Sequence, residues 1–461
     1  MTDAIKRREF LAAAAAAAAG AGLAGCTQAP LAGHTPVPTT QLTDAAVPRA
    51  PGQRSMRGVA FDTRGRARIA IVGTGLRGRS VLAELLTIEG AEITAIADLR
   101  PANAALALED IKAAKRPAPA VYTGGERDFE RLVQREDVDL VYTATPWEWH
   151  VPVCLAALNA GKHAATECPA GLTLEELWAV VDAAERNRRH CLQLENCNYG
   201  YTEMLVNRLV HAGVLGELLH CEAAYLHDLR EILFETRDEG LWRRGWHTRM
   251  DANLYPTHGL GPVARYLDIH RGDRFDYLVS MSSPEAGLSA WRDTKLAAND
   301  PRRAERYLAG DVNTSLVKTA RGRSITLQHG VSSPRPYSRL NGVQGSKGIF
   351  QDYPPRIYVE GQPGEEAFGP LDPWQATHED PLWRELGERA REQGGHGGMD
   401  FVMCWRLVQC LREGLTPDFD VYDAAAWSAP LPLSRLSVAS GSAPMKFPDF
   451  TRGEWHGPSS T

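Results

Sequence analysis

The sequence predicts an α/β protein with two domains. The first is an N-terminal Rossmann domain with a doubly wound parallel sheet, and the second is a C-terminal α+β domain with an open, largely antiparallel sheet. Three observations predict this fold. Short apolar strands alternate with helical stretches over residues 66–196, a glycine-rich loop follows the first strand, and longer segments of alternating polarity follow residue 196. A chain of 461 residues is long enough for two such domains.

The N-terminal domain is predicted over residues 66–196. Its first strand is short, apolar and β-branched, and a helical stretch and a second strand follow it, which is a βαβ unit. Strands are expected at 68–72, 92–97, 138–144, 163–166 and 192–194, and helices at 79–89, 102–115, 129–134, 151–160 and 174–187. Alternation of this kind gives a parallel sheet that is covered on both faces.

The second domain is predicted over residues 197–461 and binds the substrate. It begins with a helix at 202–212, and segments with the two-residue period of half-buried strands follow. These expected strands are 218–226, 275–282, 311–319, 324–331 and 348–360. Stretches near 284–310 and 361–398 are rich in proline and charge, so we expect surface insertions there.

Residues 1–26 have the pattern of an export signal. Arg7-Arg8 precede an alanine-rich apolar run that ends at Leu23-Ala24-Gly25-Cys26. The arginine pair resembles a twin-arginine signal, and the last four residues resemble a lipobox, in which Cys26 would be lipidated. We therefore expect a protein exported to the periplasm or cell envelope that contacts the membrane only through Cys26. A plain signal peptide with an incidental Cys26 stays open.

Residues 27–65 are rich in proline, threonine, alanine and arginine, and we expect them to form a flexible tether. The whole chain is 43% hydrophobic and 23% charged, which is a globular composition. Its net charge is −6 and it has no long basic run, so we expect no nucleic-acid partner. The sequence leaves the oligomeric state open, a homo-oligomer included.

The cysteines after residue 26 are scattered without the spacing of metal ligands. They are Cys154, Cys168, Cys191, Cys197, Cys221, Cys404 and Cys410. We interpret them as buried thiols and predict no metal site. One bridge that involves Cys191 or Cys197 stays open.

A dinucleotide site is predicted at the loop Gly73-Thr74-Gly75-Leu76-Arg77-Gly78. Gly73 makes the tight turn, Gly75 lets the backbone approach a pyrophosphate, and Gly78 lets the helix pack on the strand. The N-terminus of that helix favours phosphate charge. Asp98 ends the second strand, twenty positions after Gly78. A carboxylate there binds the ribose hydroxyls and repels a 2′-phosphate, so the sequence predicts NAD as the cofactor.

Several short motifs resemble the Gfo/Idh/MocA sugar oxidoreductase superfamily. They are Ala144-Thr-Pro146 with His150, Ala160-Gly-Lys-His163 and Glu167-Cys-Pro169. Dehydrogenases of that superfamily carry a lysine where this chain has Cys168. They also carry an aspartate four residues before a catalytic histidine, where this chain has Leu254 before His258. Two groups that handle protons are therefore missing.

Longer segments resemble one branch of that superfamily, glycoside hydrolase family 109, the NAD-dependent α-N-acetylgalactosaminidases. These segments are 142–150, 189–196, 253–262 and 271–283, and the likeness extends from about Arg66 to the C-terminal region. The resemblance implies cofactor contacts by Leu76, Arg77, Asp98, Trp147, Glu148, Trp149, His150, Glu167, Cys168 and Asn196. It implies substrate contacts by Tyr225, Arg243, Tyr255, Pro256, Thr257, His258 and Tyr337. Ordinary aromatic packing is the alternative for Trp147 and Trp149.

The resemblance also implies an activity, the hydrolysis of terminal α-linked N-acetylgalactosamine. In that family NAD⁺ takes hydride from C3, a base removes the C2 proton, and the aglycone leaves C1. Water then adds, and the hydride returns. An ordinary glycosidase needs two carboxylates at the glycosidic bond, and the sequence nominates no such pair. An NAD-dependent sugar dehydrogenase or epimerase, and a sugar-binding protein without turnover, stay open.

Three catalytic residues are expected. His258 is the expected general base, because histidine titrates near neutrality. Tyr225 and Tyr337 are expected to hold or protonate the sugar hydroxyls, and Arg243 to bind sugar oxygens. These four residues also have structural alternatives. His258 would be a buried histidine with a backbone partner, Tyr225 and Tyr337 would belong to an aromatic core, and Arg243 would be a surface arginine.

Overall fold

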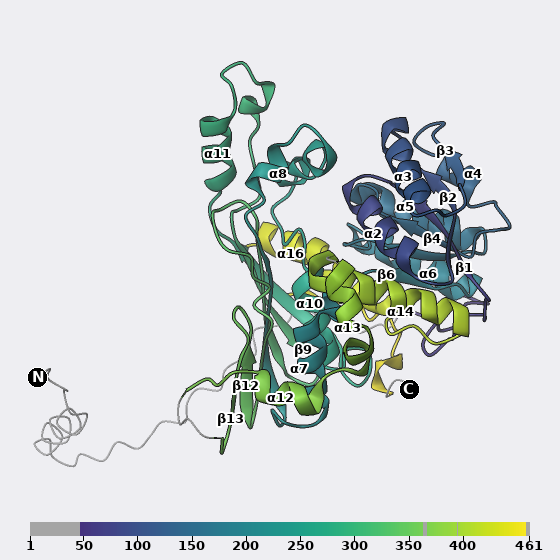
Figure 1. Ribbon diagram of the computed structural model, residues 1–461. Coiled ribbons are helices and arrows are strands. Elements are labelled where there is room, and N and C mark those ends of the chain that lie inside the picture. Colours follow the sequence, from purple (N-terminus) through teal and green to yellow (C-terminus); the bar gives the residue numbers. More distant parts are fainter. Residues whose placement is uncertain (1–46, 363–366, 394, 458–461) are drawn as a thin grey trace, which may run out of the picture. The chain divides into compact units, whose positions relative to one another are not determined.

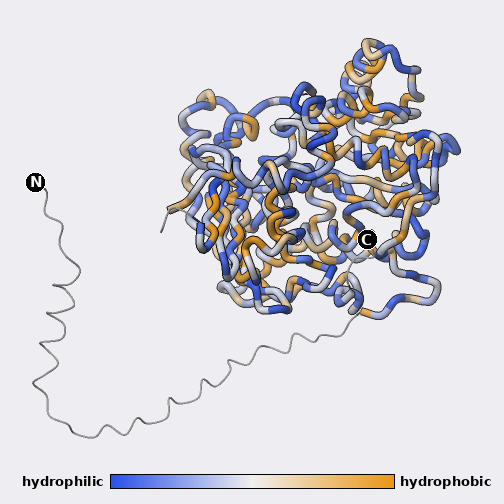
Figure 2. The backbone as a smooth tube through the Cα atoms, turned by 60° about the horizontal axis from the view of Figure 1, so that its bottom comes forward, coloured by the Kyte–Doolittle hydropathy of each residue, from blue (hydrophilic) through white to orange (hydrophobic). Residues whose placement is uncertain are grey.

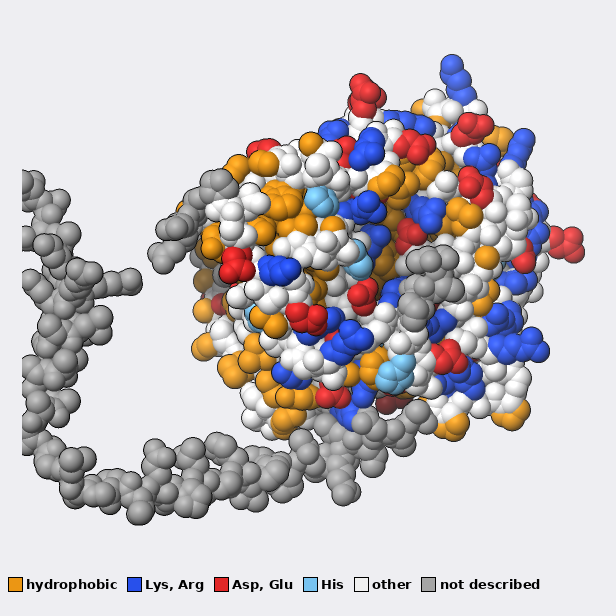
Figure 3. Space-filling model, turned by 90° about the horizontal axis from the view of Figure 1, so that it is seen from below, with side chains coloured by type: hydrophobic (Ala, Val, Ile, Leu, Met, Phe, Trp, Pro, Cys, Tyr) orange, Lys and Arg blue, Asp and Glu red, His pale blue; other side chains and the backbone are white. Residues whose placement is uncertain are grey.

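Figure 1 shows a computed structural model that describes residues 47–362, 367–393 and 395–457. The predicted export signal, Cys26 and the first part of the predicted tether lie outside these residues. In Figure 2 hydrophobic segments run through the packed interior, while the peripheral loops are mostly hydrophilic. Positive and negative side chains are interspersed on the face seen in Figure 3. Within the described ranges, no helix is long and apolar enough to cross a membrane.

The N-terminal sheet has six parallel strands in the order β3-β2-β1-β4-β5-β6. The strands are β1 (Ala67–Val72), β2 (Ala91–Ala97), β3 (Ala120–Tyr122), β4 (Leu140–Thr143), β5 (His163–Thr166) and β6 (Cys191–Gln193). The helices between them are α2 (Leu76–Thr87), α3 (Pro101–Ala113), α4 (Phe129–Leu132), α5 (Trp147–Asn159) and α6 (Leu174–Asn187). The predicted Rossmann fold is confirmed. The strand order reverses between β1 and β4, which is where such sheets bind ligands at their carboxyl ends.

The C-terminal sheet has eight strands in the order β13-β12-β11-β7-β10-β9-β8-β14. They are β7 (Leu218–Leu226), β8 (Phe275–Ser282), β9 (Asn313–Thr319), β10 (Ser324–Gly330), β11 (Gly342–Gly345), β12 (Gly348–Gln351), β13 (Arg356–Val359) and β14 (Met445–Lys446). Only β7 and β10 pair in parallel, so the predicted, largely antiparallel sheet is confirmed. The strand expected over residues 348–360 is two strands, β12 and β13, which a turn separates.

Helices α7 (Tyr201–His211), α10 (Thr257–Tyr266) and α16 (Pro430–Ala439) accompany this sheet, with α10 on β7 and α16 on β8. Between β7 and β9 the chain also forms α8 (Arg230–Phe234), η2 (Asp238–Leu241), α9 (Arg244–His247), α11 (Gly287–Lys295) and η3 (Pro301–Ala304). The stretch near 284–310 supplies α11 and η3, and α11 packs against α8. Figure 1 shows α8 and α11 together beyond one end of the C-terminal sheet.

The stretch near 361–398 was expected to be a surface insertion, and this is wrong for its second half. It forms α12 (Asp372–His378), α13 (Pro381–Gln393) and η4 (Gly395–Gly398). Trp383, Leu386 and Ala390 of α13 are buried, because this helix packs against α14 (Met399–Glu413). The high charge of α13 belongs to its exposed face.

The C-terminal helices return to the Rossmann domain. Helix α14 packs against α2 and β1, and α15 (Val421–Ser428) packs against α6 and β6. Figure 1 shows α14 running alongside the N-terminal sheet. Segments from opposite ends of the sequence therefore meet at the edge of the nucleotide-binding domain.

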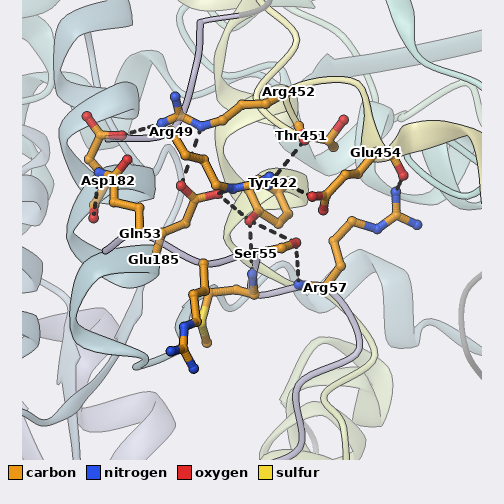
Figure 4. A network of polar contacts seen from close by, with 12 residues as sticks. Arg49, Gln53, Ser55, Arg57, Asp182, Glu185, Tyr422, Thr451, Arg452 and Glu454 are labelled. Carbon is orange, nitrogen blue, oxygen red and sulfur yellow. Dashed lines mark hydrogen bonds and ion pairs between the residues drawn. The ribbon is translucent and has the colours of Figure 1, made fainter. Parts of the chain in front are cut away.

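Residues 47–65, expected to be the second part of a flexible tether, pack against the folded body, so the prediction is wrong for this segment. Met56 and Phe61 are buried, at 1% and 4% exposure. Figure 4 shows Arg49 donating to Glu185 of α6, which also accepts from the hydroxyl of Tyr422 at 2.6 Å. The composition of a segment indicates whether it favours disorder by itself. It does not predict contacts with residues far along the chain, such as Glu185 and Tyr422, which order this segment.

Candidate active site

A cavity of about 640 Å³ lies at the carboxyl ends of the N-terminal strands. Its lining includes the glycine-rich loop and Asp98 from the Rossmann domain, and Tyr225, Arg243 and His258 from the C-terminal domain. The seven described cysteines are buried and free, as predicted, and Cys168 lines this cavity. A cavity of this size, formed by both domains, can hold a small-molecule ligand.

The three glycines of the loop differ in what surrounds them. A side chain on Gly73, whose φ is +88°, would lie 2.8 Å from the backbone of Ala144, and one on Gly78 would lie 1.9 Å from the Gly73 carbonyl oxygen. The nearest atom to a Cβ on Gly75 would be 3.9 Å away. Packing therefore requires glycine at 73 and 78, whereas the space beside Gly75 is open to a ligand.

Asp98 is fixed at the end of β2. Its Oδ2 accepts from the backbone N–H of Thr74 at 2.7 Å, and its Oδ1 accepts from that of Arg100 at 2.7 Å. Oδ2 also accepts from the Thr74 hydroxyl at 3.1 Å, so Oδ1 is the oxygen better placed to accept from a ribose hydroxyl. Leu76, which is 62% exposed, lines the cavity beside it.

Arg77 does not present a free cation to a phosphate. Its Nε donates to Glu167 at 2.9 Å and its Nη1 to Asp400 at 2.7 Å, so two carboxylates match its charge. Burial alone would lower the pKa of Arg77, but these carboxylates raise it well above its ordinary value. Asn196 also donates to Asp400, at 2.7 Å. The sequence could not reveal Asp400, which lies 323 positions after Arg77.

Trp147 and Trp149 both line the cavity. The Trp147 ring stacks with that of Tyr255 at a centroid distance of 6.0 Å and meets Trp242 edge-on at 5.3 Å. Trp149 lies edge-on to Phe129 at 6.1 Å. Trp147 thus joins the cofactor side of the cavity to the aromatic residues of the C-terminal domain.

The two polar residues of the same segment, Glu148 and His150, behave differently from the tryptophans. Glu148 is exposed on α5 and is not part of the cavity lining, so the expected cofactor contact of its side chain is not seen. His150 lines the cavity but is buried, with its nitrogens 2.8 Å from the Pro169 carbonyl and 2.9 Å from that of Thr145. Burial lowers the pKa of His150. The ring links the two loops that carry these carbonyls.

His258 forms a pair with Glu195, a residue that sequence analysis did not single out. The Nδ1 of His258 lies 2.7 Å from Oε1 of Glu195, whose side chain is fully buried. Cys168 donates to the other Glu195 oxygen at 3.1 Å. Burial would raise the pKa of Glu195, but the His258 interaction outweighs it and lowers the pKa to about 2. The available signal was the position of Glu195 just after β6, at the ligand-binding edge of the sheet.

Arg243 sits in a cage of aromatic rings. It is 6% exposed, and its guanidinium carbon lies 4.9 Å from the ring centre of Tyr255, 5.5 Å from that of Trp147 and 5.9 Å from that of Tyr225. Its Nη1 donates to Glu239, while its buried Nη2 has no partner among the described residues. A ligand oxygen is the acceptor that would complete this group.

Tyr225 and His258 face each other, with ring centres 5.3 Å apart. Burial raises the pKa of Tyr225, so its phenol stays protonated and acts as a donor. Tyr337 lies edge-on behind Tyr225 at 6.1 Å, but it does not line the cavity, and its hydroxyl accepts from Arg339 at 2.9 Å. The direct role expected for Tyr337 stays a prediction.

Pro256 and Thr257 are buried at the start of α10 and, unlike Tyr255 and His258, do not line the cavity. Their direct substrate contacts are not seen, and they position His258. The structure also adds His396 and Trp242 to the lining. The signal for His396 was its setting between glycines, at 394–395 and 397–398.

Comparison with known proteins agrees with both halves of this site. Residues 67–194 match the family described as "Oxidoreductase family, NAD-binding Rossmann fold", and residues 199–457 match "Glycosyl hydrolase 109, C-terminal domain". A glycosyl hydrolase family 109 protein of Solibacter usitatus is 54% identical over 405 residues, which cover 87% of this chain and 92% of that protein. One of Saccharopolyspora erythraea is 49% identical over 454 residues, which cover 98% and 95%.

Solved structures resemble the fold at low sequence identity. Levoglucosan dehydrogenase in complex with NADH and levoglucosan has a TM-score of 0.61 and 17% identity, covering 83% of this chain and 100% of that one. Apo scyllo-inositol dehydrogenase from Lactobacillus casei has a TM-score of 0.58 and 16% identity, covering 84% and 99%. The N-terminal domain is thus an NAD-binding Rossmann domain, and the chain has the features of a glycosidase or an NAD-binding sugar oxidoreductase. Because its C-terminal domain matches the family model and its relatives are 54% and 49% identical to it over most of their length, the chain belongs to glycosyl hydrolase family 109.

Proposed function

We propose that this protein hydrolyses terminal α-linked N-acetylgalactosamine and keeps one NAD molecule through the whole cycle. The observation that carries the proposal is the His258–Glu195 pair, which lies at the same cavity as the glycine-rich loop. The carboxylates Glu167, Glu195 and Glu239 at that cavity each pair with an arginine or a histidine. None of these three is an unpaired carboxylic acid, which an ordinary glycosidase requires as its proton donor.

The residues present fit the dinucleotide. Gly75 leaves room for a diphosphate, α2 directs its N-terminus there, and Asp98 is held for the ribose. When bound, NAD supplies a reversible hydride acceptor for C3 of the sugar, and the ketone so formed acidifies the C2 proton. Trp147, Cys168 and Asn196 line the part of the cavity that leads to the C-terminal domain.

His258 is the base for the C2 proton. Because Glu195 holds Nδ1, the proton is accepted at Nε2 and can later be returned to C2 from the same atom. Loss of the C2 proton and of the aglycone from C1 forms the C1–C2 double bond. Water then adds a hydroxyl to C1 and a proton to C2. Return of the hydride to C3, with a proton to its oxygen, would restore the C3 hydroxyl, so the net reaction would be hydrolysis.

Tyr225 and Arg243 hold and polarise the sugar. The protonated Tyr225 phenol can donate to the departing oxygen or to a ring hydroxyl. The unpaired Nη2 of Arg243 can donate to a hydroxyl or an acetamido oxygen. Because Cys168 occupies the position of the dehydrogenase lysine and bonds to Glu195, no amine stands there to assist a simple alcohol oxidation.

A chromogenic α-N-acetylgalactosaminide tests the proposal. The purified protein should release the aglycone without added NAD, and the absorbance of NADH should not accumulate. A dehydrogenase would accumulate NADH with free sugar, and a sugar-binding protein would release nothing. Either result would overturn the proposed hydrolysis.

Solvent deuterium tests the route. Turnover in D₂O should place deuterium at C2 of the released sugar, because the C2 proton leaves and returns in each cycle. Hydrolysis with no label at C2 would exclude elimination while leaving the glycosidase activity intact.

We also propose that residues 1–26 export the protein in folded form and that Cys26 becomes the lipidated N-terminus. The arginine pair and the four residues that end at Cys26 support this. The mass of the mature N-terminal peptide from the producing cell tests it. An unmodified peptide that begins elsewhere would refute the lipid anchor.

A further inference from the structure

A loop from the C-terminal half of the chain closes part of the NAD site. His396 lies in η4, between α13 and α14, and lines the same cavity as Gly75, Leu76 and Arg77. It reaches this place because α14 packs along α2, the helix that the glycine-rich loop begins. His396 therefore comes from a segment far along the chain and lines the cavity together with residues of the Rossmann domain.

Glycines hold this loop against the Rossmann helix. A Cβ on Gly395 would lie 2.3 Å from Oε1 of Glu84 in α2, and one on Gly398 would lie 2.7 Å from the backbone of Ala390 in α13. His396 itself has φ 47° and ψ 44°, the left-handed conformation that is uncommon for residues other than glycine and is adopted more often by asparagine, aspartate and histidine than by the rest. The loop thus keeps an unfavourable backbone conformation at the one residue that carries an imidazole.

The imidazole is oriented by a buried carboxylate. Nδ1 of His396 lies 2.7 Å from Oδ2 of Asp400, whose side chain is fully buried and also accepts from Arg77 and Asn196. Because Nδ1–H donates to the carboxylate, Nε2 lies on the other side of the ring, and no described residue bonds to it. The His396 side chain is 57% exposed, so a ligand can reach it.

The diphosphate of NAD needs hydrogen-bond donors, and His396 can be one of them. A diphosphate brings negative charge to the N-terminus of α2, but the Arg77 guanidinium beside it is matched by Glu167 and Asp400. The donors beside the start of α2 include the backbone N–H groups of the glycine-rich loop and the imidazole of His396. Burial would raise the pKa of Asp400, but Arg77 and His396 outweigh it and lower the pKa, so this carboxylate stays ionised and holds the ring.

We propose that His396 is a cofactor-binding residue in its doubly protonated form, in which Nδ1–H donates to Asp400 and Nε2–H donates to a diphosphate oxygen of NAD, and that Asp400 is its positioning residue. The inference rests on NAD binding by the Rossmann domain and not on the glycosidase activity. It assigns to the loop Gly395–Gly398 the task of retaining the dinucleotide.

The test is the rate of NADH release. Protein loaded with NADH is mixed with an excess of ADP-ribose, and the loss of bound-NADH fluorescence gives the dissociation rate. A hydrogen bond to a charged group predicts release about 10-fold faster in His396→Ala. His396→Gly should match the alanine variant, because glycine relieves the backbone conformation while the imidazole is still lost. Release within two-fold of the native rate in both variants would overturn the proposal.

Two controls locate the effect. His211→Ala removes another histidine of similar exposure, 45%, which pairs with Asp268 at 3.1 Å outside the cavity lining, and should leave release unchanged. Inhibition of NADH binding by ADP should weaken in His396→Ala by about as much as inhibition by ADP-ribose does. If only ADP-ribose were affected, the contact would be to the second ribose, and the diphosphate assignment would be wrong. These measurements need no substrate, so the proposed hydrolysis can fail without affecting them.

Discussion

Two histidine–carboxylate pairs lie at one cavity, and they differ in their setting rather than in their geometry. In both, Nδ1 lies 2.7 Å from a carboxylate oxygen whose side chain is fully buried. His258 is 16% exposed and packs against tyrosine rings, whereas His396 is 57% exposed and stands on a glycine loop. The hydrogen bond makes Nδ1 the donor in both rings. The surroundings decide whether Nε2 exchanges a proton with a substrate or, in the doubly protonated ring, donates to a ligand.

The two carboxylates, Glu195 and Asp400, also differ in their other hydrogen-bond partners. Glu195 is shared with the thiol of Cys168, a neutral group, so His258 is the principal source of its low pKa after burial is overcome. Asp400 is shared with Arg77 and Asn196, which already satisfy it. We therefore expect loss of His258 to disturb chemistry and loss of His396 to disturb cofactor binding.

The largest effect is expected from His258→Ala. Removal of the general base should lower kcat on the chromogenic α-N-acetylgalactosaminide about 1000-fold. NADH release should stay within two-fold of the native rate, because His258 belongs to the C-terminal domain and is not part of the glycine-rich loop. Faster NADH release with an unchanged kcat would reverse the roles of the two pairs.

Glu195→Gln should have the next largest effect. A glutamine can offer its amide N–H to Nδ1, which leaves the proton on Nε2, the wrong tautomer for a base. We expect kcat to fall about 100-fold while bound NAD is retained. The pH profile of kcat should also change shape, since the imidazole loses its charged partner. If the variant bound less NAD but kept a normal kcat per molecule of bound NAD, Glu195 would maintain the structure of the cofactor site and would not assist the base.

The same pair should make stability depend on acidic pH. The pKa of Glu195 is lowered from its ordinary 4.5 to about 2, so its contribution is fully present above pH 4.5 and is lost as the pH falls toward 2. This contribution to the free energy of unfolding is about 3 kcal/mol. Denaturant unfolding at several pH values measures it. Between pH 4.5 and 2, Glu195→Gln should lose less stability than the native protein, and parallel curves would contradict this.

Asp400→Asn should have a smaller effect, on the cofactor alone. It removes the charge that orients His396 and pairs with Arg77, and we expect NADH release to be about 10-fold faster. The kcat per molecule of bound NAD should stay within three-fold. The measurement is turnover after saturation with added NAD. A kcat that stayed low at saturation would mean that Asp400 acts on the chemistry through Asn196.

The two pairs also mark the limit of prediction from sequence. Gly73, Gly78 and Asp98 lie close together in the chain, and their spacing follows from a strand, a turn and a helix, so the cofactor loop could be located. Glu195 and His258 are 63 positions apart, and Arg77 and Asp400 are 323 apart. No local pattern encodes such meetings, because they depend on how helices return to the Rossmann domain.

The fold shows the same division. Long strands such as β7 and β8 were located by their alternating polarity, whereas β3 and β11, of three and four residues, are too short to show a period. Residues 47–65 have the composition of a linker, yet they are fixed by partners such as Glu185 and Tyr422. Local propensity therefore gave elements and their types, and tertiary contacts decided the rest.

The smallest effect distinguishes the two tyrosines that sequence analysis grouped together. Tyr225 lines the cavity and stands 5.3 Å from His258, so Tyr225→Phe should lower kcat/KM about 10-fold through the lost hydroxyl donor. Tyr337 lies behind it, and its hydroxyl already accepts from Arg339. Tyr337→Phe keeps the ring packed against Tyr225 and should change kcat/KM by about three-fold or less. A larger loss for Tyr337→Phe than for Tyr225→Phe would show that the sugar extends past Tyr225, and the cavity would then have to open toward Tyr337 when substrate binds.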